Sequence, residues 1–160
     1  MEFALKNLKN PHSRILESIP HFYWDEVLQN NGTNKYFEGR DFNIIEDPGV
    51  MRNIIQHAEM LEHYRSLIGD IAIYINSWYR PEIYNGIVLR ESGYSSSYVS
   101  DHLCTNSCAT DATLTYTNDR AEKWKKVCDV WGVNYNIGRY TWGMHLGWRT
   151  DRPNYEKDWR

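Results

Sequence analysis

The sequence has no long apolar run and little net charge. Among its 160 residues, no stretch approaches the roughly 18 apolar residues that a membrane-spanning helix needs, so we expect no membrane span. The formal net charge is −3, without the excess of Lys and Arg that binds phosphate backbones, and we expect no nucleic-acid partner. Residues 1–10 lack the apolar segment of a signal peptide, which predicts that the protein is cytoplasmic at synthesis.

Cysteine is also scarce. The chain has three cysteines, and an odd number excludes a complete disulfide framework. Cys104 and Cys108 are near enough in sequence to pair with each other, but a reducing compartment favours free thiols. A second interpretation is that their thiolates bind a metal and close its coordination, which would make the site structural.

The pattern of apolar residues predicts an α+β domain with a small antiparallel sheet and flanking helices. We expect an N-terminal arm over 1–35, the domain over 36–149 and a polar C-terminal tail over 150–160. The predicted elements are a helix over 51–68, a strand over 71–76, a helical turn over 82–85, a loop over 86–99, a strand over 112–116, a helix over 118–131 and short strands over 135–140 and 144–148.

Three residues on separate short elements have the side chains of a metal site. A short polar segment runs from Ser100 to Asp111, with His102 near its start and Asp111 at its end. His145 follows on the last predicted strand. Two imidazoles and one carboxylate can bind one zinc ion and leave its fourth tetrahedral position open, as in catalytic rather than structural sites. We therefore predict a Zn²⁺ centre at His102, Asp111 and His145.

These residues belong to an ordered set that resembles a known family. Ser77-Trp78-Tyr79-Arg80 ends a predicted strand, the segment from Ser100 to Asp111 contains Ser-x-His and Ala-x-Asp, and His145 comes last. The set is similar to the zinc peptidases of the D-Ala-D-Ala carboxypeptidase and L-alanyl-D-glutamate endopeptidase family, which share the hedgehog/DD-peptidase-like fold. The resemblance spans about residues 36–149. It implies the same three zinc ligands and a role for Arg80 in binding a substrate carboxylate or carbonyl, which a guanidinium suits.

The sequence departs from the family pattern in the loop before Asp111. The interval from His102 to Asp111 is two residues longer than in the family, and Ser107 stands where the family has glycine. A loop can bulge while its ends stay fixed, so the zinc site remains compatible with this insertion. If the insertion draws His102 away, the domain is a scaffold without metal.

A second departure concerns the acid that transfers protons. Family members carry an acidic residue three before or two after the last histidine, and these positions are Trp142 and Gly147 here. Such a group would act as general base and then as general acid. The catalytic residue is therefore unknown, and the neighbouring candidates are Glu82, Glu91 and Asp101.

Two functions follow from the resemblance. The first is a zinc-dependent peptidase that cleaves peptidoglycan stem peptides, of D-Ala-D-Ala carboxypeptidase or L-Ala-D-Glu endopeptidase type, comparable to a phage lysis enzyme. The alternative is a catalytically impaired zinc-binding domain of the same fold that acts as a virion structural or assembly protein. The peptidase would have a peptidoglycan peptide as its partner, and the assembly protein would have virion proteins. The absent acid near His145 favours the alternative.

Overall fold

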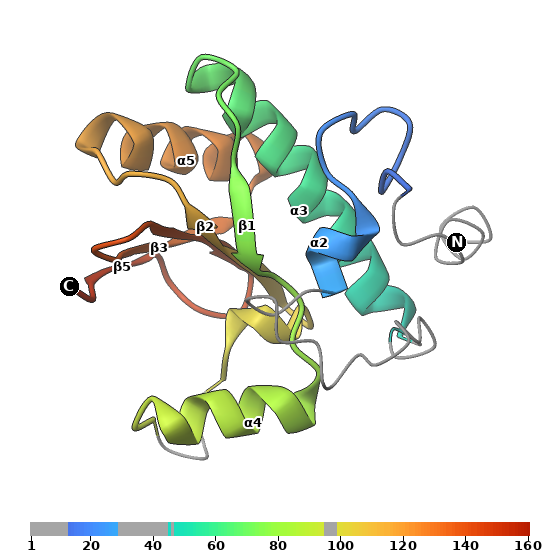
Figure 1. Cartoon of the computed structure of the whole chain (residues 1–160), viewed down its shortest axis with the longest axis vertical. Helices are drawn as coiled ribbons and strands as arrows, with labels where there is room; N and C mark the ends of the chain where they lie inside the picture. Colours follow the sequence, from blue (N-terminus) through green and yellow to red (C-terminus); the bar gives the residue numbers. More distant parts are fainter. Residues whose placement is uncertain (1–12, 29–44, 46, 95–98) are drawn as a thin grey trace.

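A five-stranded sheet forms the centre of the fold, with strand order β1-β2-β4-β3-β5 (Figure 1). The computed structural model describes residues 13–28, 45, 47–94 and 99–160. The excluded residues contain parts of the predicted N-terminal arm and the serine-rich tip of the predicted loop, so those predictions lie outside the described residues. The strands are β1 (Tyr74–Ser77), β2 (Ser107–Thr113), β3 (Asn134–Arg139), β4 (Met144–Arg149) and β5 (Tyr155–Asp158).

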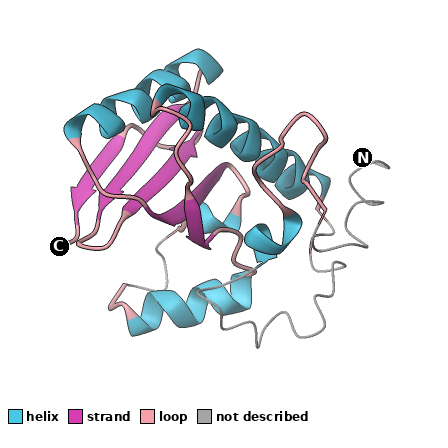
Figure 2. Ribbon diagram, turned by 45° about the horizontal axis from the view of Figure 1, so that its top comes forward, coloured by secondary structure: helices cyan, strands magenta, loops and turns pink. Residues whose placement is uncertain are grey.

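Two long helices cover one face of the sheet (Figure 2). Helix α3 (Pro48–Leu67) begins where the Asp47 carboxylate accepts a hydrogen bond from the Gly49 amide at 2.7 Å, an N-cap that satisfies a free donor. Helix α5 (Asn118–Trp131) ends at Gly132, which has a φ of 68° that costs a glycine little. Their buried faces include Ile54, Ala58, Leu61, Ala121, Trp124 and Val127.

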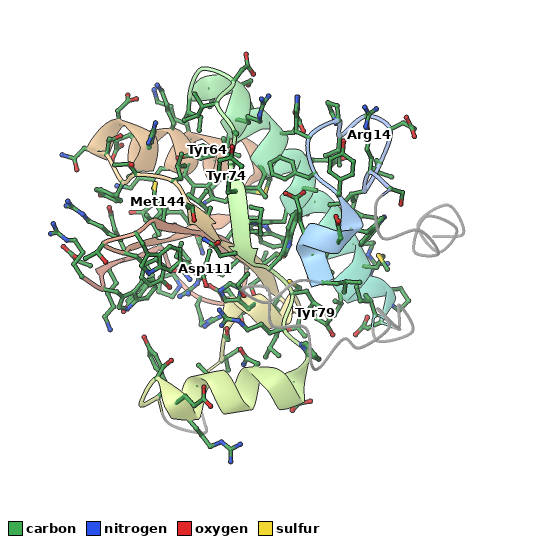
Figure 3. The ribbon with its side chains drawn as sticks, viewed as in Figure 1. Arg14, Tyr64, Tyr74, Tyr79, Asp111 and Met144 are labelled. Carbon is green, nitrogen blue, oxygen red and sulfur yellow. The ribbon has the colours of Figure 1, made fainter. Side chains whose placement is uncertain are left out.

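The N-terminal residues that are described pack against the same core. Ile15, Ile19 and Phe22 are buried, and helix α2 (Trp24–Leu28) follows them directly. Their described β-contact is an isolated bridge between Arg14 and Tyr23. Figure 3 shows Arg14 at the outside of this segment, on the far side of α3 from Asp111.

The alternation of side chains along β2 and β4 separates the core from a second, polar face. Residues 108, 110 and 112 of β2 and 144, 146 and 148 of β4 share the face toward the helices, where the Tyr64 hydroxyl contacts the Met144 sulfur. Asp111 and His145 are register partners on the opposite face. Helix α4 (Glu82–Glu91) and the 3-10 helix η3 (Asp101–Leu103) lie on that side of the sheet (Figure 1).

The α+β class agrees with the sequence prediction, but several boundaries differ. Strand β1 lies three residues later than predicted at its start, and β2 begins at Ser107, so Asp111 lies within the strand rather than at the end of a loop. Residues 86–91, predicted as loop, continue helix α4. The predicted C-terminal tail contains β5, which pairs with β3 in parallel, so the sheet is mixed rather than wholly antiparallel.

Within the described residues, no helix is both long and apolar enough to cross a bilayer.

Candidate metal centre

Three side chains from three elements meet on the polar face of the sheet. They are His102 from η3, Asp111 from β2 and His145 from β4, and one ligand atom of each lies within 4.8 Å of the others. All three residues are buried. The structure thus brings together the residues singled out in the sequence, and the group could hold a metal ion.

The orientation of His102 is set by the backbone just after β1. Its Nδ1 lies 2.7 Å from the Trp78 carbonyl oxygen, which can only accept, so Nδ1 carries the hydrogen. Its Nε2 faces Asp111 Oδ2 at 3.3 Å. Burial and the nearby Arg80 guanidinium lower the pKa of His102, which favours a neutral ring. A neutral ring directs the Nε2 lone pair at a carboxylate oxygen, an arrangement that a cation between them would stabilise.

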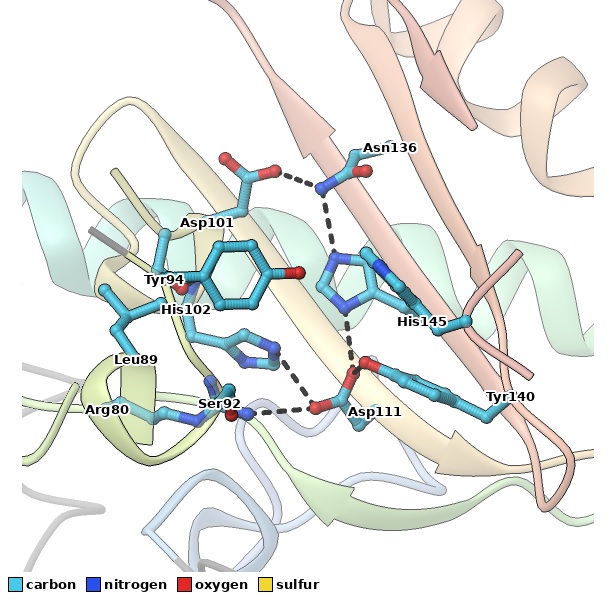
Figure 4. Close-up of a pocket in the computed structure, with 12 residues that line it drawn as sticks. Arg80, Leu89, Ser92, Tyr94, Asp101, His102, Asp111, Asn136, Tyr140 and His145 are labelled. Atoms are coloured by element: carbon cyan, nitrogen blue, oxygen red, sulfur yellow. Dashed lines mark hydrogen bonds and ion pairs between the residues drawn. The ribbon is translucent and has the colours of Figure 1, made fainter. Parts of the chain in front are cut away.

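Asp111 is the point at which the donors of the site converge. His145 Nδ1 lies 2.8 Å from Asp111 Oδ1, and Arg80 Nη2 donates to Asp111 Oδ2 at 2.9 Å (Figure 4). Burial alone would raise the pKa of this carboxyl, but the facing imidazoles of His102 and His145 outweigh it and hold the pKa well below its usual value. Asp111 is therefore an anion, as a metal ligand must be.

The chemistry of these atoms suits a divalent metal ion, and two of their contacts can be compared with those of a tetrahedral site. In a tetrahedral site with bonds of about 2.0 Å, neighbouring ligand atoms lie roughly 3.3 Å apart. His102 Nε2 lies 3.3 Å from Asp111 Oδ2, near that value, whereas His145 Nδ1 lies 2.8 Å from the other oxygen, Oδ1. The Trp78 carbonyl supplies the outer hydrogen bond that metal-binding imidazoles usually make.

Arg80 reaches the site from the end of β1. Its backbone amide donates to the His102 carbonyl at 2.9 Å, and its Nε donates to Ser77 Oγ at 3.1 Å. These contacts hold the guanidinium beside Asp111, at the wall of a pocket. The residue that the family resemblance assigns to substrate binding therefore lies next to the candidate ligands, and it is ion-paired with one of them.

A pocket of about 300 Å³ opens over the three ligands. Helix α4 and the turn after it contribute one wall, through Leu89, Ser92 and Tyr94. Tyr140 and Trp159 form the other wall. Three protein ligands beside an open pocket leave room for a small molecule at the ion, unlike a closed structural site.

The aromatic wall is one continuous stack. The Tyr140 ring lies between Trp142, at 4.6 Å and 8°, and Trp159, at 5.1 Å and 24°. Tyr140 Oη donates to Asp111 Oδ1 at 3.3 Å. Burial and the neighbouring Asp111 raise the pKa of Tyr140, so the phenol keeps its hydrogen at neutral pH. Tyr140 is a fixed hydrogen-bond donor at the site.

The cysteines do not join the ligands. Cys104 Sγ lies 2.8 Å from Cys108 Sγ, and both side chains are buried. Burial and the adjacent Cys108 thiol raise the pKa of Cys104 well above its usual value, which favours the thiol over the thiolate. Among the described residues, the group suited to a metal contains His102, Asp111 and His145 and neither cysteine.

None of the three candidate acids offers a free carboxylate to the pocket. Glu82 and Glu91 are exposed at the two ends of α4 and are not among the residues that line it. Asp101 lines the pocket and is buried, but both of its oxygens are occupied. Oδ2 accepts from Arg149 and Asn136, and Oδ1 accepts from Arg152.

The positions where the family carries its acid are filled in another way. Trp142 stacks on Tyr140. A Cβ atom at Gly147 would lie 3.1 Å from His145 Nε2 and 3.2 Å from Ala109 Cβ, because the His145 ring lies over this position. Gly147 thus leaves room for His145, and an acid there would compete with the imidazole for space.

Five residues of the site were not singled out in the sequence. Asn136, Tyr140 and Trp159 line the pocket, and Arg149 and Arg152 ion-pair with Asp101. For Asn136 the sequence did hold a signal, because a polar residue at a buried position of a predicted strand needs a hydrogen-bond partner. For Trp159 the sequence carried none, since strand β5, which brings it to the site, is exposed along its whole length.

No family model matches the chain, and no curated protein or solved structure matches it either.

Proposed function

We propose that the protein is a zinc-dependent hydrolase that cleaves a peptide bond in peptidoglycan stem peptides. One observation carries the proposal: His102, Asp111 and His145 converge at an open pocket, and Arg80 and Tyr140 point their donors at the same carboxylate. Bound zinc supplies Lewis-acid chemistry, which polarises a carbonyl and makes water a nucleophile near neutral pH. The donor set, two imidazoles and a carboxylate, is that of catalytic zinc sites.

The chain's own residues provide binding and charge stabilisation. Arg80 has donors beyond those that bind Ser77 and Asp111, and it can bind a substrate carboxylate or a carbonyl oxygen that gains negative charge. The Tyr140 hydroxyl has one hydrogen, which it gives to Asp111 over a long 3.3 Å contact, and it can rotate to donate to the same substrate oxygen instead while the stack holds its ring. A preorganised donor of this kind is worth roughly 100- to 1000-fold in turnover.

Peptidoglycan peptides are proposed as substrates because of the family resemblance and the size of the pocket. A pocket of about 300 Å³ lies at the lower end of the range for small-ligand sites and suits a short peptide end. Carboxylate recognition by Arg80 suits a stem peptide, which carries free carboxylates along its length.

A second candidate function is a zinc-binding domain without turnover that serves in a virion as a structural or assembly protein. The specific observation in its favour is the state of Asp101, whose carboxylate is saturated by two arginines and an amide. Within the described residues that line the pocket, the remaining acid is the candidate ligand Asp111, so none is left to protonate a leaving amine.

Digestion of defined muropeptides separates the two. Zinc-loaded wild type is incubated with stem peptides containing L-Ala-D-Glu and D-Ala-D-Ala bonds, and products are identified by mass spectrometry. His145→Ala is the control, because it removes a ligand. The proposal predicts cleavage by wild type alone. If zinc is bound and no bond is cut over a range of pH, the enzyme proposal fails and the assembly role is favoured.

A further inference from the structure

A second cation lies at the edge of the pocket. Lys157 is exposed on β5, the edge strand of the sheet. Its Nζ lies 6.0 Å from the centre of the Tyr94 ring and 5.9 Å from the centre of the Trp159 ring. Each of these rings belongs to one wall of the pocket, and Tyr94 points into it (Figure 4). The ammonium group therefore lies beside both walls, although Lys157 does not itself line the pocket.

The register of the sheet places Lys157 in the same cross-strand row as two candidate ligands. Successive register partners along this row are Asp111, His145, Gly138 and Lys157. Register partners point to the same face of a sheet, so Lys157 points to the polar face. Arg80 contacts Asp111 from the end of β1, on the other side of the row. The two cations thus lie at opposite ends, with the candidate ligands between them.

The residue before Lys157 points to the opposite face, as alternation along a strand requires. The Glu156 carboxylate accepts from Tyr116 Oη at 3.1 Å and pairs with Lys125 of α5 at 3.1 Å. Among the ion pairs of the described residues, those at this strand involve Glu156 and Asp158, and none involves Lys157. The Lys157 ammonium is therefore not neutralised by a carboxylate in the part of the chain that the structure describes, and it can pair with an anion that enters the pocket.

The separation of the two cations matches a short peptide. Neighbouring strands lie about 4.8 Å apart, so three spacings, roughly 14 Å, separate Asp111, the partner of Arg80, from Lys157. An extended chain spans about 3.3–3.6 Å per residue, which makes this about four residues. Along the way the Trp159 indole covers the row at Gly138. The surface between the cations is thus aromatic, which suits small apolar side chains.

We propose that Lys157 binds a second substrate carboxylate, so that the site selects peptides with carboxylates on both sides of the scissile bond, about four residues apart. This inference rests on the proposed function. Arg80 binds the carboxylate at one end of the peptide and Lys157 binds the carboxylate at the other. The peptide then crosses the strands above the candidate ligands. The rings of Tyr94 and Trp159 hold the ammonium near the pocket and leave its charge in place, because a ring attracts a cation only through its quadrupole.

Lys157→Gln tests the role, because glutamine keeps much of the side chain and removes the charge. The probes are the stem tetrapeptide L-Ala-γ-D-Glu-L-Lys-D-Ala, with both carboxylates free, and two forms in which either the D-Glu or the C-terminal carboxylate is an amide. The Kd of each for the zinc-loaded protein is measured by isothermal titration calorimetry. An exposed ion pair contributes up to about fivefold in affinity. Lys157→Gln should therefore raise the Kd of the unmodified peptide about three- to fivefold at low ionic strength, and by less at high ionic strength.

The amidated peptides identify the carboxylate that Lys157 binds. The effect of Lys157→Gln should disappear with one amidated form, which lacks the partner carboxylate, and persist with the other. Lys157→Arg keeps the charge and should bind the unmodified peptide within about twofold of wild type. Because Lys157 is exposed on an edge strand, these substitutions should leave the fold intact.

Lys123→Gln is the matched control. It makes the same change in charge on α5, which covers the other face of the sheet, where Lys123 pairs with Asp119 at 2.7 Å. It should leave every Kd unchanged within the error of the measurement. Mass spectrometry of the same samples shows whether a peptide is cut, and for a peptide that is cut the KM takes the place of the Kd.

The outcomes separate this inference from the proposed function. The inference is overturned if Lys157→Gln matches Lys123→Gln with all three peptides, if its effect is the same with all three, or if wild type binds none of them. If bonds are cut and Lys157→Gln has no effect, the inference alone fails. If binding depends on Lys157 as expected and no bond is cut, the peptidase proposal alone fails.

Discussion

Replacing Gly138 tests how the C-terminal strand completes the pocket. A Cβ atom at this position of β3 would lie 1.7 Å from Cζ3 and 2.3 Å from Cε3 of Trp159, because the indole lies flat on the glycine. Such a contact is impossible, so Gly138→Ala must displace the ring. The backbone amide of Trp159 donates to the Arg139 carbonyl at 2.8 Å, which anchors the residue beside β3 and limits how far the chain can shift to escape the clash.

The loss of stability expected for Gly138→Ala follows from the contacts that Trp159 makes. It stacks on Tyr140 at 5.1 Å and packs edge-on against His145 at 5.6 Å. An aromatic pair contributes about 0.5–1.5 kcal/mol beyond burial, and forced overpacking costs about 1–3 kcal/mol. Gly138→Ala should therefore lower the free energy of unfolding by about 2–3 kcal/mol. In an open strand the same change should instead raise it by about 0.5–1 kcal/mol.

A double-mutant cycle with Trp159→Ala separates these two outcomes. Urea unfolding of the metal-free protein is measured for wild type, each single variant and the double variant. With the indole removed, Gly138→Ala should become neutral or stabilising, which gives a coupling of about 2–4 kcal/mol between the two sites. If Gly138→Ala lowers the free energy of unfolding equally with and without the Trp159 indole, Trp159 does not lie on Gly138. The description of the aromatic wall of the pocket would then be wrong.

Three further substitutions test the site itself. Asp111→Asn leaves the partly buried Arg80 without its anion and should lower the free energy of unfolding of the metal-free protein by roughly 3 kcal/mol at neutral pH. Because the folded pKa of Asp111 is depressed, the stability it contributes is present above the unfolded pKa of about 3.9 and is lost as pH falls further. Denaturant titrations at several pH values should therefore show that the difference in free energy of unfolding between wild type and Asp111→Asn becomes smaller in acid. A difference that does not depend on pH would contradict the low pKa. Arg80→Lys cannot bind both Ser77 and Asp111 in the same way, so the KM for a carboxylate-bearing peptide should rise, and an unchanged KM would exclude substrate binding by this residue. Tyr140→Phe keeps the stack and should cost at most about 1 kcal/mol of stability, yet lower kcat by at least tenfold; equal turnover would remove the hydroxyl from the mechanism.

Much of the fold could be predicted because local signals were strong. Helix α3 has an aspartate cap, a proline in its first turn and a regular apolar stripe, and α5 has an apolar stripe and a terminal glycine. Helix α4 extended beyond its predicted end because its sequence lacks such boundaries. Strand β5 was missed because its residues are all exposed, so no alternation marks it, and its pairing with β3 spans a separation that no local pattern reveals.

The site, like the fold, could be predicted only where the signal was local in the sequence. The order and residue types of His102, Asp111 and His145 singled them out, but their convergence depends on antiparallel pairing of β2 with β4, which no local pattern in the sequence specified. The state of Asp101 could not be predicted. A carboxylate beside a histidine in sequence suggests a base, whereas its saturation by Arg149 and Arg152 depends on contacts 48 and 51 residues away.

X-ray absorption at the zinc edge of the zinc-reconstituted protein can show which atoms bind the metal. We expect one bound zinc per chain with a first shell of nitrogen and oxygen at about 2.0–2.2 Å, lost in Asp111→Asn. Sulfur neighbours at about 2.3 Å would show that Cys104 or Cys108 binds the ion, and would contradict the His102, Asp111 and His145 centre, as would a wild-type protein that takes up no zinc.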